Sequence, residues 1–432
     1  GTSVNMNGTN LVLYTSQYHG GTNKNANIGF VNDGIITTAG SNNIGWISLN
    51  EYGNTARQLY FHNRAGSMNF GGTRDILAYV MSPTAANGGW SFINDGTINL
   101  TGASQFGVIV SPTYSYNSAE LLLNAPIVIS GTGTAGVVFS GWMDLDGGAP
   151  FSRSTADNIV TALPSLSRAS VINLDLSGSN NTGVYFGNAG PTPFNLNNYT
   201  LNINGKDNTG VYIANGIVNL GTGTANAINI VGGSGNIGIF AAAAGDALST
   251  AANITVNADS SSGIFAQNTG TVTNTGNISA SGASVKAIIA DSTTVNSTGN
   301  ITVNGTALSV LDGSAGLVAQ NGGTLNITGG TTNITVDGSA STGLYAGTGS
   351  TLNLTGGTVT TTGGAFNVFS NGTVNLANTN IDTGASSLAF MAGTGGRILF
   401  NNTTATISGG SNTPATRGTA FLYQGTGHSS FT

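Results

Sequence analysis

The side chains best suited to bind a ligand gather in one stretch of the chain, residues 141–168. They are Trp142, Asp144, Asp146, Phe151 and Arg153. An aromatic ring beside carboxylate acceptors and a forked guanidinium donor can recognise a sugar or a peptide. We therefore predict a ligand site in this stretch. The alternative is a lateral flap in which Trp142 and Phe151 simply pack on the body of the protein.

A second group of candidate binding residues lies in a stretch of eight residues. The whole chain has only ten Lys and Arg in 432 residues. The members of the group are Arg57, Tyr60, His62 and Arg64. A surface that mixes aromatic and cationic side chains can recognise acidic glycans or a protein partner. The alternative is an edge loop with solvated arginines.

Metal binding and catalysis find little support in the sequence. Asp144 and Asp146 resemble the start of a calcium loop, but position twelve is Thr155, where such a loop needs glutamate. The three histidines are far apart, cysteine is absent, and no phosphate-loop motif occurs. We expect no catalytic residues, no metal and no cofactor, and therefore no enzyme. A polysaccharide-cleaving enzyme remains an alternative, and Asp144, Asp146 and Asp175 are the carboxylates it would use.

The composition limits the classes of partner. Charged residues make up 6% of the chain, and its net charge is −6. The few cations are scattered, which argues against nucleic-acid binding. No apolar run reaches the roughly 18 residues of a membrane-spanning helix, and without cysteine the chain forms no disulfide.

These candidate residues sit in a chain that repeats. A small residue opens each copy of the repeat, at Gly45, Ala78, Gly107, Gly136, Gly183, Gly210, Gly238, Gly263, Ala287, Gly316, Gly343, Asn367, Ala389 and Ala420. The gap from Gly136 to Gly183 is 47 residues and contains the 141–168 stretch; the other gaps average about 27. Such a period is the signature of a solenoid.

Each period holds short runs of alternating β-branched residues bounded by Gly, Asn and Ser, which indicate short strands. About three strands in about 27 residues predict one turn of a parallel β-helix, whose inward Ile, Val, Leu and Phe form a core only when coils stack. We predict an all-β parallel β-helix of 14–15 coils with loop insertions. Asparagines that follow the apolar runs, such as Asn296 and Asn375, are expected in turns.

The two parts of the chain differ in their decoration. Residues 1–170 contain 17 of the 32 aromatic residues and all three tryptophans. We predict that 1–170 is an aromatic-rich, decorated part that carries the insertion 141–168. Residues 171–432 would form regular coils of the same continuous solenoid, and the whole would be a fragment of a longer protein.

The repeats Thr-Gly-Asn-Ile-Thr-Val-Asn-Gly at 298–305 and Gly-Ile-Phe-Ala-Gln-Asn-Thr-Gly at 263–270 give the chain a family resemblance. It resembles the passenger domains of bacterial autotransporter (type V secreted) adhesins, above all the very large outer-membrane adhesins of fusobacteria. The resemblance implies a right-handed β-helix on the bacterial cell surface, exported through a C-terminal outer-membrane barrel that this chain does not contain. It also implies attachment to host glycans or surface receptors, or to a partner bacterium.

We therefore expect a cell-surface adhesin segment that displays its binding site on a rigid rod. One alternative is a structural spacer of a larger adhesin, and a second is the polysaccharide-cleaving enzyme. A more distant alternative is an ice-binding solenoid, which needs a flat array of Thr-X-Thr. In the sequence, Thr358-Val-Thr360 stands isolated.

Overall fold

A computed structural model describes residues 2–18, 28–50, 58–82, 89–112, 118–139, 170–187, 193–221, 226–242, 247–306, 315–338, 341–384, 387–408, 419–423 and 430–431. The chain divides into two compact units, Gly1–Ala227 (unit 1) and Ile228–Thr432 (unit 2). Every regular element in the described ranges is a β-strand. Those ranges accordingly contain no helix with the length and apolar character needed to cross a membrane.

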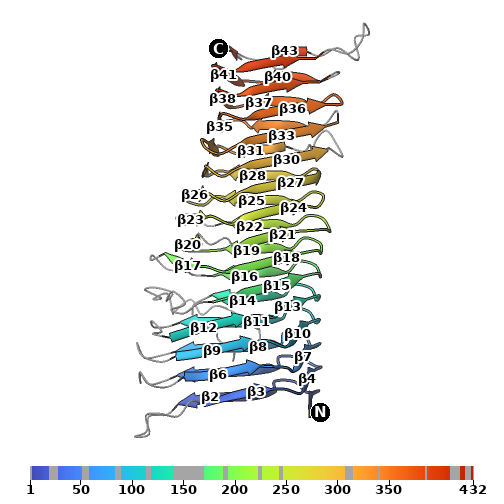
Figure 1. Cartoon of the computed structure of the whole chain (residues 1–432), viewed down its shortest axis with the longest axis vertical. Helices are drawn as coiled ribbons and strands as arrows, with labels where there is room; N and C mark the ends of the chain where they lie inside the picture. The colour runs from blue at the N-terminus through green and yellow to red at the C-terminus, as the bar shows by residue number, and fades with distance from the viewer. Residues whose placement is uncertain are drawn as a thin grey trace. The chain divides into compact units, whose positions relative to one another are not determined.

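Unit 1 is built from parallel sheets whose neighbouring strands come from successive coils (Figure 1). The first sheet contains β1 (Ser3–Met6), β4 (Ile35–Thr38), β7 (Ser67–Phe70), β10 (Thr97–Leu100), β13 (Ile127–Ile129), β15 (Ile172–Leu176) and β18 (Tyr199–Ile203). The second contains β2 (Val12–Tyr18), β5 (Ile44–Asn50), β8 (Ile76–Ser82), β11 (Phe106–Pro112), β14 (Ala135–Phe139), β16 (Thr182–Phe186) and β19 (Thr209–Ile213). The third side carries β3 (Ile28–Asn32), β6 (Gln58–Asn63), β9 (Gly89–Asn94) and β12 (Ser118–Leu123), and separately β17 (Phe194–Leu196) and β20 (Ile217–Leu220).

Unit 2 has the same three-sided coils. Its first sheet contains β21 (Ala227–Ile230), β24 (Asn253–Asn257), β27 (Ile278–Ala283), β30 (Ile301–Thr306), β33 (Thr332–Asp337), β36 (Thr358–Thr362), β39 (Asn380–Thr383) and β42 (Thr404–Ile407). Its second contains β22 (Ile237–Ala241), β25 (Ser262–Gln267), β28 (Lys286–Asp291), β31 (Ala315–Gln320), β34 (Thr342–Ala346), β37 (Phe366–Ser370), β40 (Leu388–Ala392) and β43 (Thr419–Tyr423). Its third contains β23 (Ala247–Thr250), β26 (Thr271–Asn274), β29 (Thr294–Ser297), β32 (Thr324–Ile327), β35 (Thr351–Thr355), β38 (Thr373–Ala377), β41 (Arg397–Asn401) and β44 (Ser430–Phe431).

The predicted parallel β-solenoid is thus confirmed, and its handedness stays a prediction. The pairing of Val184 with Val211 gives the offset of one coil as 211 − 184 = 27 residues. The long gap does not break the ladder, because β13 pairs with β15 and β14 with β16. The predicted boundary at residue 170 separates an aromatic-rich part with an insertion from regular coils. It also stays a prediction.

The small-residue series forms columns in the second sheets. Register is continuous from Gly107 to Gly210 in unit 1 and from Gly238 to Ala420 in unit 2. A Cβ built on Gly183 would lie 2.6 Å from the carbonyl oxygen of Gly210, so the backbones approach too closely there for a side chain.

One member of the predicted series is wrong. The column passes from Gly45 through Leu77 to Gly107, and Ala78 lies one residue later. Ala78 instead pairs with Trp46, and both side chains are buried. The small Ala78 side chain faces the large indole of the preceding coil. Ala78 is therefore small because it packs beside Trp46 in the interior, and not because the backbones approach closely in the column.

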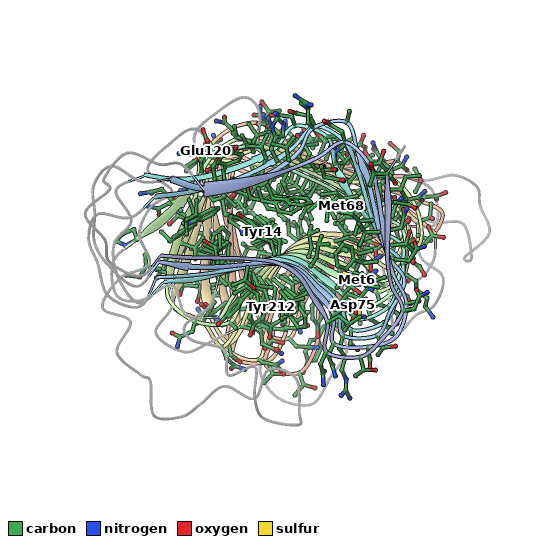
Figure 2. All side chains as sticks on the ribbon, turned by 90° about the horizontal axis from the view of Figure 1, so that it is seen from below. Met6, Tyr14, Met68, Asp75, Glu120 and Tyr212 are labelled. Carbon is green, nitrogen blue, oxygen red and sulfur yellow. The ribbon has the colours of Figure 1, made fainter. Side chains whose placement is uncertain are left out.

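The core of each unit consists of inward columns of apolar side chains. In unit 2, one column runs through Val272, Val295, Leu325, Leu352 and Val374, all buried. In unit 1 the side chains of Met6 and Met68 point into the space that the sheets enclose (Figure 2). Each such Val, Leu or Ile contributes about 1.5–3 kcal/mol by leaving water.

Candidate ligand-binding surface

The structure divides the predicted site residues into two sets. Trp142, Asp144, Asp146, Phe151 and Arg153 lie outside the described residues, and so does Arg57. Tyr60, His62 and Arg64 are described, and they share one face of unit 1. The prediction for the 141–168 stretch therefore stays a prediction, while the geometry of the second group can be given in full.

Strand β6 presents Tyr60 and His62 outward because the side chains of a strand alternate. Their neighbours Leu59, Phe61 and Asn63 are buried, and Phe61 stacks between Phe30 and Phe92 at centroid distances of 5.2 and 5.4 Å. This inward aromatic stack fixes the strand, so the outward side chains keep their direction.

A buried asparagine ladder marks the end of the same strands. The Asn63 side-chain amide lies between those of Asn32 and Asn94, joined by Nδ2–H···Oδ1 bonds of 2.8 Å each, and Asn94 donates to the Ala125 carbonyl at 2.9 Å. The next residues along the chain, Asp33, Arg64 and Asp95, follow this ladder in three successive coils. They form the polar edge of the surface.

Arg64 and His62 both contact carboxylates. Arg64 donates from Nε to Asp33 Oδ1 at 2.9 Å, and its Nη2 contacts Asp33 Oδ2. His62 Nε2 lies 2.7 Å from Asp95 Oδ2, and Asn124 Nδ2 donates to Asp95 Oδ1 at 2.7 Å. All of these groups remain exposed enough for a ligand to reach.

These contacts explain the titration of the surface groups. The hydrogen bond from Arg64 holds the pKa of the Asp33 carboxyl below its ordinary value, and the same contact raises the pKa of Arg64. Hydrogen bonds from Asn124 and then from His62 lower the pKa of Asp95. Both carboxylates are therefore ionised at neutral pH, and the surface is not cationic.

The rest of the face is polar and aromatic. The Tyr60 ring covers the backbone of Gly29, where an added Cβ would lie 2.2 Å from ring atoms. Ser91, beside Tyr60 in the next coil, donates to Glu120 Oε2 at 2.6 Å. Glu120 lies on the outer side of the third sheet (Figure 2). Ser91 itself is buried. Tyr60, His62, Arg64, Asp33, Asp95 and Glu120 together form what we call the β6 surface.

The sequence identified Arg64 and His62 but not their partners. Phe30-Val-Asn-Asp33 and Phe92-Ile-Asn-Asp95 are two copies of one motif, and Phe61-His-Asn-Arg64 is the intervening copy with arginine in place of aspartate. The register of Asn32, Asn63 and Asn94 aligns the three copies. That one substitution was the signal that could have placed Arg64 between two carboxylates.

The β6 surface does not combine into a metal centre. Across the described ranges, no three His, Asp or Glu side chains come together in a way that could hold a metal ion.

Comparison with known proteins adds no assignment. No protein-family model matches the chain, and no curated protein and no solved structure is significantly similar to it.

Proposed function

We propose that the chain is a segment of a bacterial cell-surface adhesin of the autotransporter type, and that the β6 surface takes part in attachment. The parallel β-solenoid of each unit is compatible with this role, because stacked ladders hold outward side chains in fixed positions without disulfides. In this proposal the protein is displayed on the outer membrane. It acts by binding and not by catalysis.

The observation that carries the proposal is the concentration of charge on the β6 surface. In a chain with 6% charged residues, it brings together one arginine, one histidine and three carboxylates beside an aromatic ring. Fixed donors and acceptors next to a ring are the elements of a carbohydrate or peptide subsite.

The charge pairing changes the expected ligand. The sequence suggested acidic glycans, but Arg64 and His62 already contact Asp33 and Asp95. An acidic sugar would be repelled because the three carboxylates of the surface outnumber its one arginine. We therefore propose a neutral glycan or a polar protein segment on a host cell or a partner bacterium.

The test is adhesion of the full chain to epithelial cells and to a glycan array. We expect Arg64→Gln and Tyr60→Ala to weaken binding by several-fold to tenfold, as for the loss of about 1–1.4 kcal/mol at one contact. The matched control is Lys206→Gln, which removes an exposed cation whose Nζ lies 3.8 Å from Asp207. Binding by wild type that neither surface variant affects would contradict the role of the β6 surface.

A deletion of 141–168 separates the two predicted sites. Loss of adhesion in this variant alone would place the ligand on that stretch. If neither wild type nor any variant binds cells or glycans, the spacer alternative is favoured over the adhesin.

A further inference from the structure

The third sheet of unit 2 carries a regular outward array of small polar side chains. Strands β26, β29, β32, β35 and β38 each begin with threonine and place threonine or asparagine two residues later. In register, the first column is Thr271, Thr294, Thr324, Thr351 and Thr373, and the second is Thr273, Asn296, Asn326, Asn353 and Asn375. We call these ten residues the Thr/Asn array.

A third column extends the array at the ends of the strands. It consists of the exposed residues Thr275, Thr298, Thr328 and Thr355. The residues between the columns, such as Leu325 and Leu352, are buried, so all three columns face outward. Coils are spaced by about 4.8 Å and alternate residues by about 6.6 Å, which gives the array a two-dimensional repeat.

The asparagines of the second column are held by one another. Asn326 Nδ2 donates to Asn296 Oδ1 at 2.7 Å, Asn353 to Asn326 at 2.6 Å, and Asn375 to Asn353 at 2.5 Å. This ladder fixes each amide in one orientation. The neighbouring threonines are stiff about χ1 because they are β-branched.

The ladder leaves hydrogen-bonding capacity at every coil. An asparagine amide has two donor hydrogens and two acceptor lone pairs, and each inner member of the ladder uses one of each. Every coil thus offers both a donor and an acceptor, next to a threonine hydroxyl and methyl group. No charged or aromatic side chain lies on this outward face of β26, β29, β32, β35 and β38.

This chemistry selects the occupant. A polyanion needs cations, and a polysaccharide chain is normally held by aromatic platforms; the array has neither. Water in ice is a periodic lattice of neutral groups that both donate and accept hydrogen bonds. We propose that the Thr/Asn array binds the surface of ice, with its hydroxyls and amides holding a first layer of water in a lattice-like order.

The sequence alone does not predict this array, because Thr-X-Thr is the pattern expected of an ice-binding solenoid. Four of the five strands carry Thr-X-Asn, and the asparagines were expected in turns. The inference is independent of the adhesin proposal, since the β6 surface lies in unit 1 and the array in unit 2.

The test uses the full chain and measures thermal hysteresis, inhibition of ice recrystallisation, and partition into slowly growing ice. We expect wild type to enter the ice in preference to serum albumin and to slow recrystallisation. Thr324→Tyr, in the middle of the array, should abolish most of this activity because its ring prevents contact with a flat lattice. The double variant T324V/T351V keeps the side-chain shape and should also lose activity.

The control is Val231→Tyr, which adds the same ring at an exposed position of unit 2 outside the strands of the array. It should retain full ice activity. The proposal is overturned if wild type partitions no better than albumin, or if Val231→Tyr and Thr324→Tyr are equally impaired. Equal folding of the variants is checked by their thermal midpoints. Binding to crystalline cellulose or chitin that Thr324→Tyr alone abolishes, without ice activity, would overturn ice as the occupant.

Discussion

Asn367 shows how one polar residue can replace glycine inside the solenoid. It occupies the small-residue column between Gly343 and Ala389, yet its side chain is fully buried. Its Oδ1 accepts from Thr361 Oγ1 and Thr383 Oγ1 at 2.7 Å each, and its Nδ2 donates to the carbonyls of Val359 and Asp382 at 2.7 and 3.0 Å. The amide is thus completely hydrogen-bonded.

The first prediction concerns this network. Asn367→Gly should destabilise unit 2 by about 2–4 kcal/mol, because it leaves two buried hydroxyls without an acceptor. Denaturant unfolding measures the loss. The triple variant N367G/T361V/T383V removes the stranded hydroxyls too and should recover part of the stability. Equal stability of the single and triple variants would show that the network is not what holds Asn367 in place.

Asp291, at the end of β28, is a buried carboxylate that forms no ion pair with any described Lys, Arg or His. Burial acts to raise its pKa. Side-chain hydrogen bonds from Gln320, Asn321, Ser292 and Gln267 outweigh this effect, so the pKa lies below its ordinary value of 3.8. The shortest two are 2.9 Å each, from Gln320 Nε2 and Asn321 Nδ2.

The second prediction is the pH dependence that follows. Because the folded state lowers this pKa, the stabilisation is fully present above the unfolded value near 4 and is lost as pH falls through the folded pKa. Urea midpoints measured from about pH 6 to about pH 2 should fall in wild type. Asp291→Asn should start lower and change less with pH. A wild-type slope that Asp291→Asn does not reduce would assign the acid sensitivity to another group.

Among the elements, the strands of the second sheets depend most on close backbone approach. A Cβ on Gly263 would lie 2.6 Å from the carbonyl oxygen of Ala287 and 3.1 Å from Ile278 Cγ2. Parallel hydrogen bonds hold β25 and β28 on both sides of this point. The neighbours therefore have little freedom to move away.

The third prediction follows from this contact. Gly263→Val should destabilise unit 2 by about 1–3 kcal/mol through overpacking. Its control is Thr255→Val, which places the same side chain on the exposed outward face of β24. Thermal melting compares the two. A Gly263→Val midpoint as high as that of Thr255→Val would mean that the ladder can shift to accept a side chain.

At this scale the sequence predicted the period and most of the register, because inward apolar residues and column glycines recur at the coil length. The sequence-based prediction was wrong at positions where a residue type suits more than one structural role. Ala78 is small for the sake of Trp46, and Asn296 and Asn375 lie on strands although asparagine favours turns. The partners of Arg64 and His62 were missed because they come from neighbouring coils and only the register brings them together.

At the scale of a whole unit, each described strand pairs with strands of the adjacent coils, so a local defect should remain local. All three tryptophans belong to residues 1–170, within unit 1. Tryptophan fluorescence therefore reports unit 1, while far-ultraviolet circular dichroism reports strands of both units.

The fourth prediction uses this separation. Asn367→Gly should lower the midpoint of the part of the circular dichroism transition that comes from unit 2. The tryptophan fluorescence midpoint, which reports unit 1, should stay at its wild-type value. Unfolding in urea with both probes on one sample is the measurement. If the two midpoints move together by the same amount, distant coils unfold as one cooperative block.

Parallel coils bound by rows of hydrogen bonds have a mechanical consequence. When either unit is pulled from one of its own terminal coils, the load opens the rows one coil at a time, as in a zipper. The force at which it yields is then set by the row under load at the end being pulled and not by the number of coils. Lengthening such a protein by further repeats would extend its reach without making it harder to peel apart.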